Sequence, residues 1–596
     1  MFGHHGRYLR IDLSTGAVTR RPLPEDVLRR FLGGVGLGTY LMHKESPPRL
    51  DPLSPEAPLI FSFSPLVGTP LTTSAKFAVL AKSPLTDRLN DALSSSHFAI
   101  SGKKTGCDAL VITGKATEPS LLIVADGNVE IRPATNLWGL PVGEADSHVR
   151  SLLGPRFHSA IIGPAGENLV RFATISHENR HAGRGGLGAV MGSKNLKAVA
   201  VAGTQLTDVA DPAGVVAAAK DLSRRSFGPA TAKYRELGTV ANLLTFNRLA
   251  VLPTRNFQQG QFEGAEALSG EALNGARRVA RHSCACCTIG CEHIYAGPEG
   301  EVRLEYESLF ALGPLCGIAD RDTVLRAAQR CDQLGIDTIS TGATIAFAME
   351  CAERGLLDEP GLCFGNADQL LSLVERIARR DGLGDLLAEG TRRAAVAIGG
   401  DAPDFAPHVK GLELPGYEPR ALQTMALGFA VGSRGADHNR SGAYEVDFST
   451  RADRLHGSPE AARLAVETED RAALMDSLIL CKFLRGVFSD LFAESADLLT
   501  RVTGWAVGPE ELHAAAQRIV TAKKLYNIRE GWTAEEDTLP KRFLSQALSD
   551  GGSTNAVLPR ERLQDMIQAY YQARGWDDQG KVRAETRERL KLTDIC

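Results

Sequence analysis

Two patterns of hydrophobic and polar residues divide the chain. Up to about residue 205, short apolar runs are separated by Gly, Pro and other turn residues, which is typical of β-strands. The predicted strands lie near residues 8–13, 57–62, 76–81, 109–113, 120–125, 159–162, 171–175 and 196–202. From about residue 208, apolar residues recur three and four positions apart, which predicts helices near residues 322–334, 339–354, 367–380, 462–483, 509–525 and 560–574.

The order of these elements predicts an α+β protein in which strands and helices are segregated, rather than a repeating βαβ unit. A chain of 596 residues is too long for a single hydrophobic core. We therefore expect a β-rich N-terminal domain over residues 1–205, a mainly helical domain over 206–410 and a second mainly helical domain over 411–596.

Charge and composition narrow the class of protein. A net charge of −4 over this length argues against a nucleic-acid-binding surface, which needs a dense basic face. No stretch reaches the roughly 18–20 apolar residues of a membrane helix, and the N-terminus lacks the pattern of a signal peptide. We therefore expect a cytoplasmic protein that contacts neither nucleic acid nor membrane. Its eleven cysteines are then expected to be thiols or metal ligands rather than disulfides.

The cysteines carry the clearest chemical signal. Cys284, Cys287 and Cys291 form C-x2-C-x3-C, and Cys481 lies far downstream as a candidate fourth ligand. Three thiolates at this spacing can bind three irons of an iron–sulfur cubane, and a remote cysteine can bind the fourth. The spacing alone also fits a structural zinc site that uses His293, or a set of inert buried thiols. Cys286 fits neither metal pattern.

A glycine-rich segment is the second signal. Residues 182–194 contain G-x-G-x-x-G around Gly183, Arg184, Gly185 and Gly186. A dinucleotide site would need a strand directly before the glycines, a helix after them and an acidic residue about 20 positions on, and the sequence offers none of these in place. Glycine backbone N–H groups beside Arg184 would instead suit a phosphate. The alternative is a glycine-rich turn without a ligand.

Several polar residues are weaker candidates. Two predicted helices end in acidic segments whose carboxylates could face a ligand, at residues 332–337 and 476–481. A helix that ends at Gly335 does not need a ligand to explain its end. Glu307 has apolar neighbours that would raise the pKa of its carboxyl and suit it to proton transfer, unless it forms a surface ion pair. His438 lies in a polar loop, where a histidine is often merely solvated.

Together these segments resemble the tungsten-containing aldehyde:ferredoxin oxidoreductase family. The resemblance rests on residues 6–16, 162–168, 182–197, the C-x2-C-x3-C, the Glu305-Tyr306-Glu307-Ser308 segment, residues 332–340, residues 414–417 and the remote Cys481. It extends from the N-terminus to near residue 590, and the order and spacing of the segments are more specific than any one of them.

The resemblance implies two pterins that hold one tungsten (or molybdenum), beside one [4Fe-4S] cluster, and it allows a Mg²⁺ ion between the pterin phosphates. The N-terminal domain would be the base that binds both pterins. The implied cluster ligands are Cys284, Cys287, Cys291 and Cys481. The implied pterin and magnesium contacts are Lys76, Leu93, Ser95, Ala182, Gly183, Arg184, Gly185, Gly186, Asp332, Ile336, Asp337, Asp476 and Lys482. Glu307 and His438 fall beside the metal and are candidates for proton transfer.

The implied reaction is oxidation of a small-molecule aldehyde by water to a carboxylic acid, with electrons leaving through the cluster to a ferredoxin-like or iron–sulfur partner. Two alternatives stay open. One is another low-potential reaction on the same cofactor, such as reduction of a carboxylate or an acyl-thioester. The other is a non-catalytic iron–sulfur electron-transfer subunit.

Three departures from the family pattern surround the implied pterin site. Ile479 replaces a glycine in the segment that ends at Cys481, Lys76 replaces an arginine, and Leu93 replaces an asparagine of the magnesium site. Leu93 cannot bind Mg²⁺, so an ion would need carbonyls, water or Asn90. The Glu-x-x-His that bridges some dimers through iron reads Arg-Ala-Ala-Gln at residues 326–329. We predict no bridging iron, and any homodimer would form without one.

Overall fold

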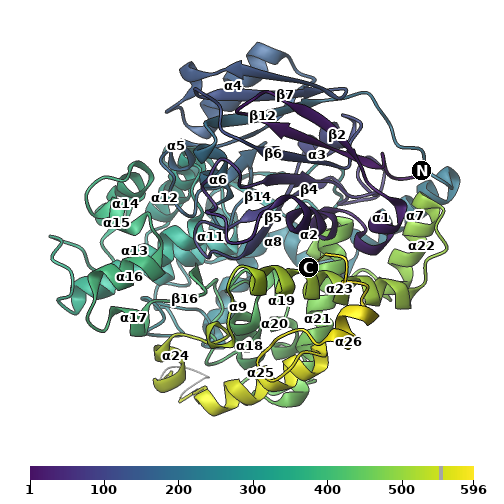
Figure 1. Ribbon diagram of the computed structural model, residues 1–596. Coiled ribbons are helices and arrows are strands. Elements are labelled where there is room, and N and C mark those ends of the chain that lie inside the picture. The colour runs from purple at the N-terminus through teal and green to yellow at the C-terminus, as the bar shows by residue number, and fades with distance from the viewer. Residues whose placement is uncertain (549–554, 596) are drawn as a thin grey trace.

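A computed structural model describes residues 1–548 and 555–595 (Figure 1). The N-terminal part contains two β-sheets and the remainder is mainly helical, which confirms the predicted α+β class. In Figure 1 the sheets form the upper part of the molecule, and the helices of the later residues surround them below and to the left. The three-domain boundaries stay a prediction.

The two sheets have six strands each. The first has the order β2-β1-β6-β3-β4-β5 and the second β11-β10-β9-β12-β7-β8. Their bounds are Arg7–Asp12 (β1), Val18–Pro22 (β2), Leu59–Ser62 (β3), Lys76–Lys82 (β4), Leu89–Ser95 (β5), Ala109–Thr113 (β6), Ser120–Ala125 (β7), Asn128–Pro133 (β8), His158–Ile161 (β9), Ile175–His177 (β10), Arg180–Ala182 (β11) and Leu196–Ala202 (β12). The edge strands β5 and β11 contact each other, so one edge of each sheet meets the helical part of the molecule at the same place.

Helices also occur among the first 205 residues. They are α1 (Glu25–Phe31), α2 (Gly34–Glu45), α3 (His97–Lys103), α4 (Val142–Leu153), α5 (Pro164–Glu167) and α6 (Leu187–Ser193). A small third sheet, β13 (Arg278–His282), β14 (Glu292–Gly297) and β15 (Gly300–Arg303), flanks the cysteine loop, and β16 (His408–Val409) pairs with β17 (Leu412–Glu413).

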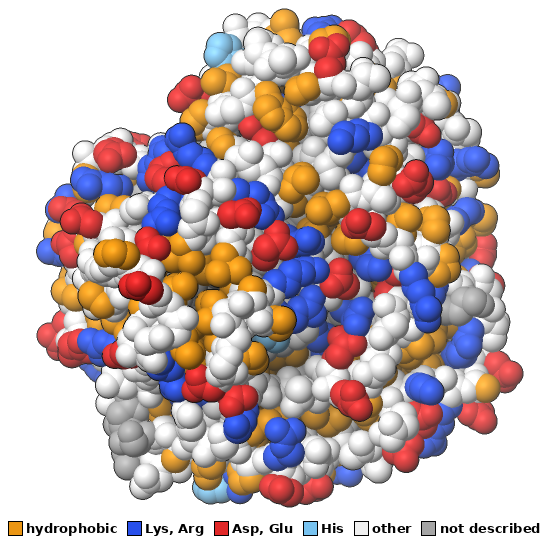
Figure 2. All heavy atoms as spheres, turned by 60° about the vertical axis from the view of Figure 1, so that its left-hand side comes forward, with side chains coloured by type: hydrophobic (Ala, Val, Ile, Leu, Met, Phe, Trp, Pro, Cys, Tyr) orange, Lys and Arg blue, Asp and Glu red, His pale blue; other side chains and the backbone are white. Residues whose placement is uncertain are grey.

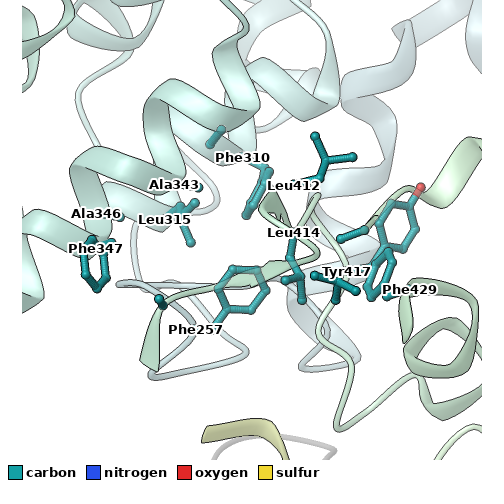
Figure 3. Packing of buried hydrophobic residues seen from close by; sticks show 14 of the residues in the cluster. Phe257, Phe310, Leu315, Ala343, Ala346, Phe347, Leu412, Leu414, Tyr417 and Phe429 are labelled. Atoms are coloured by element: carbon teal, nitrogen blue, oxygen red, sulfur yellow. The ribbon is translucent and has the colours of Figure 1, made fainter. Parts of the chain in front are cut away.

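The remaining helices build the lower part of Figure 1. The principal ones are α7 (Pro212–Ser226), α9 (Asn242–Arg248), α10 (Gly270–Ala276), α11 (Tyr306–Leu312), α12 (Arg321–Leu334), α13 (Thr338–Glu353), α14 (Ala367–Arg379), α16 (Thr391–Ile398), α18 (Gln423–Val431), α19 (His438–Ser441), α21 (Pro459–Leu478), α22 (Leu491–Thr503), α23 (Pro509–Arg529) and α25 (Arg560–Arg574). Figure 3 shows their core, in which Phe310, Leu315, Leu414 and Phe429 pack together and Tyr417 lies at one end of the cluster. This core supports α11 from behind.

The sequence predictions of the elements are mostly confirmed, with two corrections. The strand predicted at 171–175 is wrong, because this segment packs against the helical part and the strand β10 begins only at Ile175. The helix predicted to run to residue 483 ends at Leu478, because Ile479 adopts a left-handed conformation. The prediction also missed β2 and β8, which are largely exposed, and β5, which is buried but mixes polar with apolar residues.

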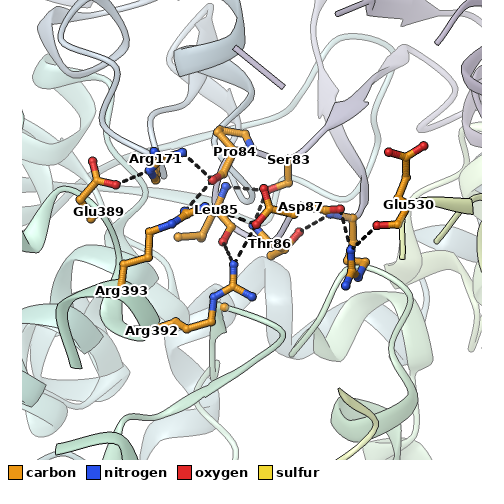
Figure 4. A network of polar contacts seen from close by, with 12 residues as sticks. Ser83, Pro84, Leu85, Thr86, Asp87, Arg171, Glu389, Arg392, Arg393 and Glu530 are labelled. Carbon is orange, nitrogen blue, oxygen red and sulfur yellow. Dashed lines mark hydrogen bonds and ion pairs between the residues drawn. The ribbon is translucent and has the colours of Figure 1, made fainter. Parts of the chain in front are cut away.

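Arginines of the helical part hold the loop between β4 and β5 (Figure 4). Arg393 donates to the carbonyl of Pro84 (2.7 Å) and Arg392 donates to that of Leu85 (3.0 Å). Arg171 also donates to the Pro84 carbonyl, at 2.9 Å. The loop is thereby fixed between the sheets and α16.

The surface has no dominant sign of charge on the face that Figure 2 shows, where acidic and basic side chains are interspersed. Among the residues that the structure describes, no helix has the length and apolar character needed to cross a membrane.

Candidate active site

A cavity of about 390 Å³ lies where β5 and β11 meet the helices. Its walls come from β5, from β11 and the glycine-rich segment after it, from α11, α12 and α13, from the loop before α19 and from the end of α21. Residues far apart in the sequence are therefore brought to one place. Polar and charged side chains dominate the lining, which suits a large polar ligand rather than an apolar one.

Three of the four predicted cluster cysteines, Cys284, Cys291 and Cys481, line this cavity. All four are partly buried, whereas Cys286 is exposed and has a positive φ of 51°. Burial raises the pKa of Cys287 to about 11 and holds that of Cys291 well above its ordinary value. Thiolates at these positions therefore need a bound cation to stay deprotonated.

The geometry does not favour a zinc site. Sulfurs around one tetrahedral zinc lie about 3.8 Å apart, but within the described ranges no three of these cysteines place their sulfurs within 4.8 Å of one another. His293 is buried, and its ring nitrogens face Asn274 Oδ1 (3.1 Å) and the carbonyl of Arg235 (3.2 Å). A [4Fe-4S] cubane does not require such close sulfurs, because each thiolate binds a different iron.

Thr73 connects the two parts of the cysteine site, and the sequence analysis missed it. Its backbone N–H donates to the carbonyl of Cys286 (2.6 Å), and its hydroxyl accepts the backbone N–H of Cys481 (3.2 Å). Beside it, the Thr72 hydroxyl accepts the N–H of Thr288 (3.0 Å). The β3–β4 connection thus holds the loop at 284–291 against the segment after α21.

The glycine-rich segment follows β11, and its glycines differ in role. Gly183 and Arg184 line the cavity. A Cβ at Gly183 would meet only Asp337 Oδ1, at 4.0 Å, so open space lies over this residue. Gly185 and Gly186 lie behind the wall at positive φ, and a Cβ at Gly186 would come within 2.0 Å of the Arg171 carbonyl. Ala182 is fully buried at the end of β11.

Arg184 is fixed by the helical part of the molecule. Its guanidinium donates to the carbonyls of Ala436 (2.7 Å) and Glu413 (2.5 Å), while its Nε lies 3.5 Å from the Asp337 carboxylate. That Nε is buried and makes no hydrogen bond. A buried donor without a hydrogen bond, on a residue that lines the cavity, is the feature expected where an anionic ligand binds.

The first acidic helix end also reaches the cavity, where Asp332, Ile336 and Asp337 form one wall. His181 Nε2 lies 3.0 Å from Asp332 Oδ1, and Arg303 lies 3.9 Å from the other carboxylate oxygen. Burial raises the pKa of Asp332, but these two partners together hold it below its ordinary value. Asp337 also caps α13, because its carboxylate accepts the Ser340 N–H at 3.1 Å.

The second acidic helix end forms the opposite wall. Lys482 Nζ lies 2.9 Å from Asp476 Oδ1, and Arg440 lies 3.4 Å from Oδ2, which is buried and makes no hydrogen bond. Burial lowers the pKa of Lys482 to about 8. Ile479 lies just behind, fully buried, at φ 66° and ψ 33°. The backbone conformation that glycine adopts readily is therefore kept by a β-branched residue.

Lys76, Leu93 and Ser95 all line the cavity from β4 and β5. Burial would lower the pKa of Lys76, but the charges at Cys481, Cys284 and Asp476 raise it overall. Asn90 does not line the cavity and instead faces Gly185. The neighbouring Asp91 is buried and paired with Arg440 and Lys523. Its carboxylate is thus already neutralised by two cations.

Glu307 and His438 lie together on the cavity wall. Glu307 Oε1 is 3.5 Å from His438 Nε2, and Glu307 Oε2 accepts the N–H of Gly416 at 3.1 Å. Burial raises the pKa of Glu307 to about 8 and lowers the pKa of His438 to about 4. At neutral pH both groups are therefore uncharged, and the pair can hold or release one proton near neutrality.

A second cavity of about 230 Å³ adjoins the first. Glu307 and His438 line both cavities and so form part of the partition between them. The lining of the second cavity includes the aromatic rings of Tyr234, Phe246, Tyr306, Tyr417, Tyr444, Phe448 and Phe483, beside the cations Lys233 and Arg485. Tyr417 stacks on both His438 (5.0 Å between ring centroids) and Tyr444 (5.1 Å). The sequence pointed to residues 414–417 and to His438, but it could not show that these rings lie together.

Two sequence models of one family match the chain. The model described as the aldehyde ferredoxin oxidoreductase N-terminal domain matches residues 8–203, and the model described as domains 2 and 3 of the same enzyme matches residues 217–592.

Similar proteins are known from archaea. The tungsten-containing aldehyde ferredoxin oxidoreductases of Pyrococcus furiosus and Thermococcus kodakarensis are each 38% identical over 612 aligned residues, which cover 100% of both chains. The WOR-like subunit of an aliphatic sulfonate oxidoreductase from Pyrococcus furiosus is 30% identical over 99% of this chain and 97% of its own. Among solved structures, the active-site complex BamBC of benzoyl coenzyme A reductase with 1,5-dienoyl-CoA has a TM-score of 0.85 at 25% identity, over 100% of this chain and 98% of that one.

Proposed function

The chain belongs to the aldehyde ferredoxin oxidoreductase family, and on that premise we propose that it oxidises an aldehyde with water to the carboxylic acid. The two electrons would leave singly through a [4Fe-4S] cluster to a ferredoxin-like acceptor. The observation that carries the proposal is the partition: Glu307 and His438 separate an aromatic cavity from a polar cavity that the cysteines line.

The residues present fit a bis-pterin centre of tungsten or molybdenum. Arg184, Asp476, Glu307 and His438 each carry a buried polar atom that makes no hydrogen bond, and all four residues line the same cavity. Arg184 and Asp337 would hold one pterin, and Asp476 and Lys482 the other. The bound metal supplies the capacity to accept the two electrons of the oxidation. If Mg²⁺ binds here, main-chain carbonyls, water or the Ser95 hydroxyl would supply its ligands, because Leu93 has no oxygen in its side chain.

The protein's own contribution is to place the aldehyde and to handle the proton. Gly416 fixes one oxygen of Glu307, and the stacked ring of Tyr417 orients His438. A water at the partition would transfer a proton to the Glu307 carboxylate as it attacks the carbonyl carbon. His438, an uncharged imidazole, would donate a hydrogen bond to the carbonyl oxygen where negative charge develops.

The aromatic cavity favours an aldehyde that carries an aromatic ring. Phe246 packs against Phe448 (5.3 Å) and against Tyr417 (5.4 Å), so a planar substituent would meet ring faces and edges. We expect kcat/KM for phenyl-substituted aldehydes to exceed that for short aliphatic aldehydes by about tenfold. Replacing Phe246 with Ala should reduce this preference, whereas equal values for both aldehyde classes would contradict it.

The decisive experiment combines metal analysis with a dye-linked aldehyde assay on natively expressed protein. We expect four irons and one tungsten or molybdenum per chain, and aldehyde-dependent dye reduction. Four irons with neither heavier metal would contradict aldehyde oxidation and would favour the electron-transfer subunit.

A second candidate is a low-potential reduction of an acyl-thioester. It is favoured by the structural similarity to a benzoyl coenzyme A reductase complex and by the aromatic lining of the second cavity. Reductant-dependent turnover of an aromatic acyl-thioester, without aldehyde oxidation, would select this reaction.

The partners follow from the same premise. We expect a ferredoxin-like or iron–sulfur subunit as acceptor, a cytoplasmic location and, if the chain dimerises, no iron between the copies. Arg326 of α12 stands where some family members have a glutamate that binds the bridging iron. Its guanidinium cannot bind iron and instead pairs with Glu299 at 3.3 Å.

A further inference from the structure

Three potential metal ligands meet in the N-terminal part of the chain, and two of them, His97 and Glu178, line a cavity that Cys284 also lines. His97 is the first residue of α3, His158 is the first residue of β9, and Glu178 lies in the turn between β10 and β11. One nitrogen from each ring and one carboxylate oxygen lie within 4.8 Å of one another. We propose that His97, His158 and Glu178 bind a divalent transition metal of the zinc class.

The contacts converge on the carboxylate. Glu178 Oε1 lies 2.7 Å from His158 Nδ1, and Oε2 lies 3.1 Å from His97 Nδ1. The two rings stack with their centroids 5.3 Å apart and turn the same nitrogen toward one point. Around one tetrahedral zinc, nitrogen and oxygen ligands would be about 3.3 Å apart, so small side-chain rotations would complete the site.

The ligand chemistry suits zinc better than magnesium or calcium. Two imidazoles and one carboxylate are the ligands that zinc takes in sites with an open fourth position, whereas magnesium and calcium select oxygen. The His97 side chain is 58% exposed, and those of His158 and Glu178 are about one-fifth exposed. The site is thus open to solvent for entry of the ion and for a water as fourth ligand.

The turn itself gives independent support. Glu178 and Asn179 both have positive φ, 44° and 59°, in a two-residue connection between β10 and β11. Such turns favour Asn, Asp or Gly at both positions, and glutamate is disfavoured at the first. A strained residue is retained where its side chain has a task, and here the strain presents the carboxylate to both histidines.

A metal at this place would brace the cofactor cavity from outside. The same hairpin carries Arg180 and His181 on β11 into the cavity wall, and Ser95 precedes His97 by two residues. The ion would join α3, β9 and the hairpin by three bonds. It would thereby cross-link these three elements, and its binding can be measured without reference to turnover.

The test is a zinc titration of the holoenzyme after treatment with a mild chelator, followed by calorimetry. We expect one zinc per chain beyond any bound by the His97→Ala/His158→Ala double variant, and a rise in the thermal midpoint on binding. Glu178→Gly relieves the strained turn and should fold at least as well as the parent chain, yet its zinc affinity should fall about tenfold or more. His148→Ala, at an exposed histidine on α4, is the matched control and should bind as the parent does.

Equal zinc stoichiometry and affinity in the parent and in Glu178→Gly would overturn the proposal, as would the absence of zinc binding by the parent. Crystals soaked in zinc give a second readout. An anomalous peak between the three side chains supports the site, and a peak only elsewhere excludes it.

Discussion

At the scale of single residues, the Glu307–His438 pair is the most informative. Its two members come from α11 and α19, more than a hundred positions apart, and they meet only because Gly416 and Tyr417 hold each side chain in place. The sequence could mark each residue as a candidate. It could not show that the two residues lie between two cavities, because that depends on contacts between distant elements.

Glu307→Gln should reduce turnover at least about 100-fold and leave the iron and tungsten or molybdenum contents unchanged, because glutamine cannot accept the proton. In the parent enzyme, kcat/KM should rise as the pH is raised through about 8, since burial raises the pKa of Glu307 to about 8 and only the carboxylate acts as a base. The measurement is a pH profile of dye-linked aldehyde oxidation. Full activity of the variant, or a profile that falls over this range, would remove Glu307 from its role.

Ile479 gives a prediction about stability. Its left-handed backbone conformation costs about 1–2 kcal/mol for a residue with a side chain, but its buried side chain packs against Gly34. Both Ile479→Ala and Ile479→Gly lose this packing, and only glycine relieves the backbone. We expect Ile479→Gly to unfold about 2 °C above Ile479→Ala in a thermal scan.

The neighbouring Leu478 supplies the control for this comparison. It is equally buried but ends α21 with helical dihedrals, so its alanine variant should be the more stable of the pair by about 1 kcal/mol. If the alanine variant is more stable than the glycine variant at both positions, the backbone of Ile479 is not strained.

At the scale of elements, the errors of sequence reasoning have physical causes. The strand β5 was missed because Leu89–Ser95 carries polar residues that face the cavity or pair with buried cations. The segment 171–175 looked like a strand because its apolar residues are buried, yet they pack under α12 and α15 (Leu383–Leu387) rather than in a sheet. A hydrophobic pattern predicts that a residue is buried, but it does not predict which element packs against it.

The residues predicted for the site lie near one another, whereas some predicted ends of helices and strands were wrong. Residues of all three predicted motifs line one cavity: Cys284, Cys291 and Cys481, then Asp332, Ile336 and Asp337, and finally Asp476 and Lys482. Residues that bind one cofactor must lie close together in the folded protein, so the motif itself predicts their proximity. The supporting residues, such as Thr73 and Arg440, carry no local pattern and could be found only from the fold.

The loop between β4 and β5 should control retention of the cofactor. The buried Ser83 hydroxyl donates to the Gly185 carbonyl (2.8 Å) and accepts the N–H groups of Leu85 and Thr86 (3.1 Å each). Ser83→Ala would leave these groups unpaired, at a cost of about 1–3 kcal/mol, and would free the backbone beside Arg184. We expect tungsten or molybdenum to be lost on dialysis, measured by elemental analysis.

Asp87→Asn is the matched control in the same loop. The Asp87 side chain is 40% exposed and pairs with Arg392 (3.1 Å) and Arg393 (3.3 Å), and such exposed pairs contribute no more than about 1 kcal/mol. Metal contents should stay at the level of the parent protein. Equal losses from both variants would mean that the loop acts through its charge rather than through Ser83.

At the scale of the whole molecule, the site joins all parts of the chain. The sheets supply Lys76 and Arg184, the middle helices supply Glu307 and Asp337, and the C-terminal helices supply Asp476 and Lys482. The cavity therefore cannot form before the parts have docked. Bound cofactors would stabilise this docked arrangement by mass action.

Cys481 tests this dependence directly, because it connects the C-terminal helices to the loop at 284–291. Cys481→Ala removes the fourth ligand, so we expect less than four irons per chain, an altered electron paramagnetic resonance spectrum of the reduced protein and loss of dye-linked activity. Cys286→Ala is the matched control from the same loop, since Cys286 is exposed and contributes its backbone carbonyl to Thr73. This variant should keep four irons and full activity. Four irons and an unchanged spectrum in Cys481→Ala would show that another residue is the fourth ligand. The C-terminal helices would then contribute no ligand to the cluster through Cys481.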